Sequence, residues 1–130
     1  MKKKRIFFII GLFLVTIVFL SYYVLSGRHR NISKEDPTIT LKAIELHNPF
    51  KNNNSHIASS YIDKVAQVTG RLTDITGKTL ELDYMIQVDL TDSLSTSLDM
   101  GMMVTIKGRC VGYDDMLEVV KIDQAIILLK

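Results

Sequence analysis

Apolar and polar residues alternate along most of the chain after residue 64, and this period of two is typical of half-buried β-strands. Polar turns such as Thr76-Gly77-Lys78 separate the runs. We predict five strands with these apolar sets facing inward: Ala66, Val68, Gly70 and Leu72; Leu80, Leu82 and Tyr84; Ile86, Val88 and Leu90; Val104, Ile106, Gly108 and Cys110; and a last set within Leu117 to Leu128. Five short strands without intervening helices predict a mainly β domain, either a small antiparallel barrel or a sandwich.

Two places depart from this alternation. The segment TDSLSTSLDMG, residues 91–101, predicts a turn or a short helix that ends at Gly101. In the last strand, the inward-facing set shifts between Val119 and Val120, which predicts a bulge or a bend.

A continuous apolar run occupies the N-terminus of the chain. Ile6 to Leu25 contains no charged residue. A helix of this length spans roughly 30 Å, the thickness of the hydrocarbon core of a bilayer. We therefore predict one N-terminal transmembrane helix, with residues 1–27 as a membrane anchor and the lipid bilayer as its partner. A cleaved signal peptide is the alternative, although the run is longer than the apolar region of most signal peptides.

A polar segment joins the anchor to the strands. We predict a linker over residues 28–40 and a folded domain over residues 41–130. Thr38 or Thr40 is placed to cap a short helix at the start of that domain. Pro49 is expected to end or kink this helix, because proline lacks the backbone N–H that an α-helix uses.

Charge is distributed unevenly along the chain. The whole sequence has a formal net charge of +2, but residues 1–30 hold six Lys/Arg and no acid, so residues 31–130 hold 10 Lys/Arg against 14 Asp/Glu, a net of 10 − 14 = −4. Four basic residues at positions 2–5 precede the apolar run, and Arg28 and Arg30 follow it. The positive-inside rule favours a cytoplasmic N-terminus. We predict a single-pass cell-membrane protein with an extracytoplasmic C-terminal domain, periplasmic if the cell is Gram-negative.

Three stretches of the folded part carry a resemblance to a known family: YIDKVAQVTGRLTDI, MIQVDL and GMMVTIKGRCVGYDDMLEVVKIDQAII. They resemble the tRNA-anticodon-binding-like OB-fold family, many of whose members are small bacterial proteins with an N-terminal membrane anchor. The resemblance covers about Leu41 to Leu128 and implies a five-stranded OB-fold barrel with a short helical lead-in. It implies little about activity, because function does not follow from fold alone. Similar sequences often have a second cysteine at the place of Ala125 and sometimes one at Val88, so the resemblance implies no paired-cysteine role for Cys110.

Candidate ligand-binding residues fall on the face of the second and third strands, on the fourth strand and in the loop after it: Tyr84 and Gln87; Lys107 and Arg109; and Tyr113, Asp114 and Asp115. An OB fold that holds single-stranded nucleic acid uses a basic groove and exposed aromatic platforms. The part of the chain after residue 30 is acidic and offers few aromatic residues. Nucleic acid is therefore retained as an alternative partner but is disfavoured, and Lys107 and Arg109 also fit a solvated strand face.

Other chemistries lack the residue patterns that they need. Cys110 belongs to an inward-facing set, which predicts a buried thiol without a redox role. His29, His47 and His56 form no metal-ligand spacing with it. No G-x-S-x-G motif is present, and no histidine follows residue 56. We predict no enzyme activity, no cofactor and no metal site.

These observations lead to one functional prediction and two alternatives. We predict a membrane-anchored, exported OB-fold binding module, whose ligand is a protein, a peptide or a glycan at the cell envelope. The first alternative is an oligonucleotide-binding OB domain. The second is a structural subunit of an envelope complex.

Overall fold

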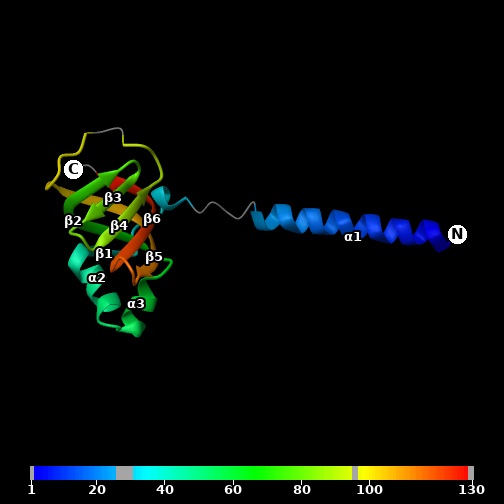
Figure 1. Ribbon diagram of the computed structural model, residues 1–130, viewed down its shortest axis with the longest axis horizontal. Helices are drawn as coiled ribbons and strands as arrows, with labels where there is room; N and C mark the ends of the chain where they lie inside the picture. The colour runs from blue at the N-terminus through cyan, green and yellow to red at the C-terminus, as the bar shows by residue number, and fades with distance from the viewer. Residues whose placement is uncertain (1, 26–30, 95–96, 129–130) are drawn as a thin grey trace. The chain divides into compact units, whose positions relative to one another are not determined.

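The computed structural model describes residues 2–25, 31–94 and 97–128 of the chain. The chain forms two compact units, Met1–Arg30 and Asn31–Lys130. Figure 1 shows the elements of each unit along the chain. Arg28 and Arg30, which entered the charge argument, lie outside the described residues, as do positions 28–30 of the predicted linker.

The first unit contains one helix, α1 (Lys2–Leu25). Within α1, Lys3–Val24 is 22 residues long with a mean hydropathy of 2.5, so it is long and apolar enough to cross a membrane. The predicted N-terminal helix is confirmed. None of its most apolar window is buried among the described residues, and by length and composition the helix fits a membrane anchor or a signal sequence.

The second unit is built around a closed barrel of five strands: β2 (Val65–Thr76), β3 (Thr79–Leu82), β4 (Ile86–Leu90), β5 (Met103–Asp114) and β6 (Val119–Leu128). The strands follow the order β2-β3-β4-β6-β5, and β5 pairs back onto β2 to close the barrel. All neighbours are antiparallel except β4 and β6, which are parallel. This order and this single parallel pair confirm the predicted OB-fold barrel.

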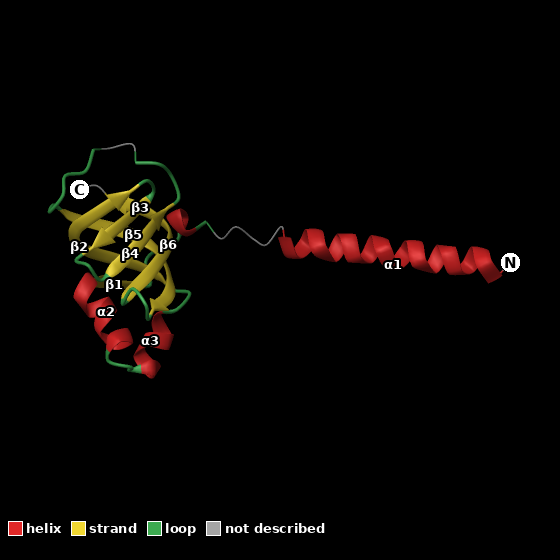
Figure 2. Cartoon of the chain, in the orientation of Figure 1, coloured by secondary structure: helices red, strands yellow, loops and turns green. Residues whose placement is uncertain are grey.

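Four short elements precede the barrel: η1 (Ile32–Lys34), β1 (Ile39–Lys42), α2 (Ala43–Lys51) and α3 (Ser55–Tyr61). In Figure 2, α2 and α3 lie together at one end of the barrel. They close that end because Leu46, Phe50 and Ala58 are buried in the same core as the strands. The predicted helical lead-in is confirmed.

The lead-in contains a strand that the sequence did not predict. β1 runs parallel to β2, with Ile39 opposite Ala66. Thr38 therefore precedes a strand and Thr40 lies within it, so the prediction that either residue caps a helix is wrong. Helix α2 begins at Ala43 instead, where other groups satisfy its first donors.

The start and the end of α2 have separate physical causes. At the start, the Glu45 carboxylate accepts a hydrogen bond from the Lys42 backbone N–H at 2.8 Å, which satisfies a donor that the helix itself leaves free. At the end, Pro49 does not stop the helix, which continues to Lys51. Burial of Phe50 in the core holds this last turn, because it compensates for the hydrogen bond that proline removes.

The connection between β4 and β5 was predicted as a turn or a short helix. Its described residues, 91–94 and 97–102, contain no helix and form a turn at Met100 and Gly101. Gly101 has a φ of 86°, a left-handed conformation that glycine adopts without strain. Its N–H donates to the Leu72 carbonyl at 2.8 Å, so the turn is tied to β2.

The bulge that we predicted between Val119 and Val120 is not there. Both residues are buried, and β5 and β6 pair in unbroken register at this point. The register of β5 and β6 shifts instead between Lys107 and Arg109 and between Cys110 and Gly112. Val119 does not belong to the core cluster inside the barrel and lies beside a surface groove that is described below.

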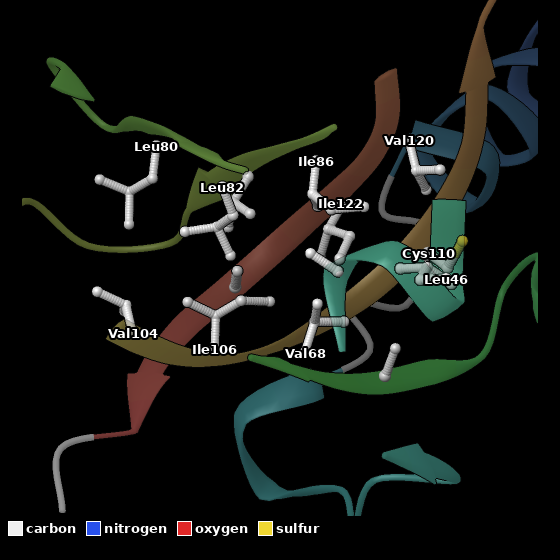
Figure 3. Close-up of a cluster of buried hydrophobic side chains, with 14 of the residues drawn as sticks. Leu46, Val68, Leu80, Leu82, Ile86, Val104, Ile106, Cys110, Val120 and Ile122 are labelled. Carbon is white, nitrogen blue, oxygen red and sulfur yellow. The ribbon is translucent and has the colours of Figure 1, made fainter. Parts of the chain in front are cut away.

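The inward-facing sets form one core inside the barrel. Figure 3 shows several of these side chains converging there, among them Val68, Leu82, Ile86, Ile106 and Ile122. Cys110 is fully buried, as predicted, and burial raises the pKa of its thiol to about 11, so the thiolate that reacts in redox chemistry does not form near neutral pH.

Candidate ligand-binding groove

A groove of about 250 Å³ crosses the outer face of the barrel. Its lining comes from β2, β3, β4 and the connection into β6: Asp74, Thr76, Thr79, Leu80, Glu81, Gln87, Leu117 and Val119. Polar side chains of the strands thus face Leu117, within the β5–β6 turn, and Val119, at the start of β6. Such a mixture of apolar surface and a few convergent polar groups is typical of binding sites.

The β2–β3 hairpin forms one wall of the groove. Thr76 and Thr79 are paired across a two-residue turn, and Gly77 in that turn has a φ of 61°, as two-residue hairpins require. The register of β2 and β3 shifts between Leu72 and Asp74. A bulge of this kind increases the twist of a hairpin, so the pair curves over the barrel face.

The β5–β6 turn forms the opposite wall, and Asp114 shapes it. Its Oδ1 accepts hydrogen bonds from the backbone N–H groups of Met116 at 3.0 Å and Leu117 at 3.1 Å, and its Oδ2 pairs with the Lys121 ammonium at 2.8 Å. The hydrogen bond from Lys121 and those from the backbone lower the pKa of Asp114. The carboxylate thereby fixes the turn that presents Leu117 to the groove.

A histidine on α2 forms a hydrogen bond to the same turn. His47 is only 3% exposed, and its Nε2 donates to the Glu118 carbonyl at 2.8 Å. The donation requires a proton on Nε2, because a carbonyl can only accept. The Nδ1 atom is buried and has no hydrogen-bond partner among the described residues. Sequence reasoning missed this role because 71 residues separate the two partners.

Tyr113 supports this contact as a packing residue. Its ring lies 5.7 Å from that of His47 and stacks at 6.0 Å on that of Phe50. Burial of the ring, together with the carboxylates of Glu118 and Asp115, raises the pKa of its hydroxyl. Tyr113 therefore connects α2 to the end of β5, where it positions the turn.

Two neighbouring polar residues line the groove. Glu81 and Gln87 are directly opposite each other on β3 and β4, and both are half-buried. Within the described part of the chain, neither side chain has a hydrogen bond or an ion pair. The next cross-strand pair differs, because Thr79 Oγ1 donates to Asp89 Oδ1 at 2.7 Å. Because both side chains are only half-buried, their polar atoms are open to water or to a ligand.

The two basic candidates on β5 are engaged in the fold. Lys107 Nζ donates to the backbone carbonyls of Ser33 and Glu35, each at 2.9 Å, which ties η1 to the barrel. Arg109 Nε donates to Asp123 Oδ1 at 2.9 Å. This hydrogen-bonded carboxylate raises the pKa of Arg109. Neither residue lines the groove.

The remaining candidates lie in turns. Tyr84 was predicted to face inward on the second strand, but it lies in the β3–β4 turn, 74% exposed and with a φ of 58°. A turn that tight forces the chain out of strand geometry, so the alternation stops at Leu82. Asp115 is exposed in the β5–β6 turn. Of the seven candidates, the structure places Gln87 in the groove and Asp114 beneath one wall of it.

Metal ligation receives no support from these side chains. Among residues 2–25, 31–94 and 97–128, no group of three or more His, Cys, Asp and Glu is arranged to hold a metal ion. The groove instead offers carboxylate, amide and hydroxyl groups beside an apolar wall.

The barrel topology and the groove across β3 and β4 define an OB-fold module of the binding type. A family model described as tRNA_anti-like matches residues 1–124, and the chain belongs to this family. Among solved structures, the chain is similar to a candidate nucleic acid-binding lipoprotein from Klebsiella pneumoniae, with 18% sequence identity and a TM-score of 0.51. The match covers 69% of this chain and 91% of that chain, and at this identity it shows the fold. No curated protein matches the chain.

Proposed function

We propose that the protein is a membrane-anchored binding module of the cell envelope and that its ligand binds in the groove between the β2–β3 hairpin and the β5–β6 turn. OB folds hold ligands on the face of their second and third strands, between these same two connections. The observation that carries the proposal is the pair Glu81 and Gln87, which lie in this groove without partners in the described part of the chain.

Export of the barrel is part of this proposal. Helix α1 has the length and hydropathy of a membrane span, and the basic residues before it favour a cytoplasmic N-terminus. A C-terminal alkaline phosphatase fusion is expected to be active, because that enzyme folds only outside the cytoplasm. An inactive phosphatase fusion together with an active cytoplasmic reporter fusion would overturn the orientation. The size of the mature protein in membranes distinguishes an anchor from a cleaved signal.

The ligand is a protein, a peptide or a glycan in this proposal, and the module binds it without catalysis. The net charge of −4 over residues 31–130 disfavours a ligand with a phosphate backbone. Nucleic acid is nevertheless the second candidate, since the similar Klebsiella protein is described as a candidate nucleic acid-binding lipoprotein.

A titration of residues 31–130 with labelled single-stranded DNA and RNA, read by fluorescence anisotropy at low salt, separates these candidates. We expect no binding at protein concentrations of about 10 μM. Micromolar, salt-dependent binding would replace the leading candidate with the second. Stable co-purification of the full chain with one membrane complex, without any exchangeable ligand, would instead favour a structural subunit.

A further inference from the structure

We infer that the groove receives a short basic peptide segment of a partner protein. In this arrangement, a lysine or arginine side chain lies against Glu81 and Asp74, and a neighbouring apolar side chain packs against Leu117 and Val119. The inference rests on the proposed function and adds the chemical class of the ligand.

Charge is the first argument for a cationic ligand. Glu81 and Asp74 both line the groove. Two lysines flank these strands, but each is used elsewhere: Lys78 Nζ donates to the Thr91 carbonyl at 3.3 Å, and Lys121 pairs with Asp114 at 2.8 Å. Within the described residues, no ion pair joins a basic side chain to Glu81 or Asp74, and a ligand with a positive group complements these two carboxylates.

The second argument concerns the groups that a peptide backbone needs. The Gln87 amide offers both donors and an acceptor, and it has no partner within the described residues. It stands directly opposite Glu81. A peptide can satisfy the amide with its main chain while its cationic side chain meets the carboxylate.

The lining also disfavours the other ligand classes. No aromatic residue is among the side chains that line the groove, whereas nucleic-acid bases stack on aromatic platforms. Tyr84 is highly exposed but lies in the β3–β4 turn, outside the lining. Phosphate groups would be repelled by the two carboxylates.

Size and apolar surface favour a peptide over a free polyamine. A volume of about 250 Å³ lies below the ~300–1,000 Å³ that is usual for sites of drug-sized molecules, so the groove accommodates one or two side chains. Leu117, 61% exposed, gives an apolar contact that a polyamine chain uses poorly and that a valine or leucine next to a lysine fills.

The test uses the full chain in phosphatidylcholine nanodiscs and a set of fluorescent pentapeptides. The peptides share the pattern Ser-X-Val-X-Ser, with X as lysine, glutamine or glutamate, and empty nanodiscs correct for lipid binding. Three variants accompany the natural chain. E81Q removes a groove charge, L117S removes the apolar wall, and D36N makes the same type of charge change at an exposed residue that does not line the groove.

We expect the lysine peptide to bind and the other two peptides to bind at least about tenfold more weakly. E81Q should weaken binding of the lysine peptide by about two- to fivefold, as expected for one partly exposed charge pair. L117S should also weaken it, and D36N should leave it unchanged. Spermidine and a neutral oligosaccharide should compete poorly.

The failures of the two proposals are distinguishable. The glutamine peptide, the oligosaccharide or spermidine could bind at least as tightly as the lysine peptide, with binding that L117S weakens. That result would overturn the basic-peptide ligand but would keep the groove as the binding site. Failure of every probe to bind at about 1 mM, or binding that ignores both E81Q and L117S, would overturn the groove as the binding site as well.

Discussion

Strand β5 and the face formed by β3 and β4 use polar residues in opposite ways. On β5, Lys107 holds two backbone carbonyls and Arg109 holds Asp123. On the other face, Glu81 and Gln87 have no such partner in the described part of the chain. Side chains that form hydrogen bonds within the protein maintain the fold, whereas half-buried polar groups without a protein partner can form hydrogen bonds to a ligand. Lys107 and Arg109, the basic candidates from the sequence, therefore stabilise the fold.

The largest effect is expected where β5 passes closest to its neighbour. A Cβ at Gly108 would lie 2.5 Å from Ile122 Cγ2 and 2.9 Å from Ala125 Cβ. Gly108→Val should therefore lower the free energy of unfolding by about 3 kcal/mol, because the core has no room for the added atoms. Chemical denaturation measures this change. Val111→Ala, at an exposed position of the same strand, should stay within about 0.5 kcal/mol.

A smaller effect is expected from the ion pair on β5. Arg109→Met leaves the half-buried Asp123 carboxylate without its bidentate partner, and we expect a loss of about 1–2 kcal/mol in the free energy of unfolding. Arg71→Met serves as the control, since Arg71 is exposed, and should change stability by less than about 0.5 kcal/mol. Equal stability of both variants would mean that the Arg109 charge is as dispensable as a surface charge.

The groove should respond differently to the same chemical change. Asp123→Asn replaces a paired carboxylate with an amide and should cost about 1 kcal/mol. Glu81→Gln makes the equivalent change at a carboxylate without a partner, and the free energy of unfolding should stay within about 0.5 kcal/mol or rise. Thermal denaturation of the two variants side by side measures the contrast. A larger loss in Glu81→Gln would assign Glu81 to the fold.

The smallest effect concerns the turn beside the groove and depends on pH. The pKa of Asp114 is lowered in the folded protein, so its ionised form stabilises the fold. This contribution is complete above the unfolded value of about 3.9 and is lost as the pH falls through the lower folded value. Asp114→Asn should therefore be less stable than the natural chain at pH 7, and the difference should shrink as the pH falls below about 3.9. A difference that does not shrink would point to a change in the turn itself.

The barrel was predictable because its strands are half-buried and alternate strictly. Ala66, Leu80 and Ile106 all face the core as the period of two requires. The prediction failed where a local contact overrode the pattern. Tyr84 continues the alternation in sequence but lies in a tight turn with positive φ, and Val119 is buried although it does not belong to the core cluster inside the barrel.

The groove itself was predictable only in part. Gln87 was a candidate because it faces outward on the third strand of the barrel. Glu81, Leu117 and His47 were not, since their roles depend on contacts between segments far apart in the chain: the groove joins β3 to the β5–β6 turn, and His47 reaches Glu118 from α2. Charge alone pointed to Lys107, because a sequence shows a charge but not its partner.

The position of the ligand tests the account most directly. An amide NMR spectrum of residues 31–130, recorded during titration with the lysine pentapeptide, reports every backbone group that the ligand approaches. We predict the largest shifts at Thr79, Glu81, Gln87 and Leu117, with little change at Lys107 and Arg109. Shifts centred on Lys107 and Arg109, or no shift at the four groove residues, would contradict the account.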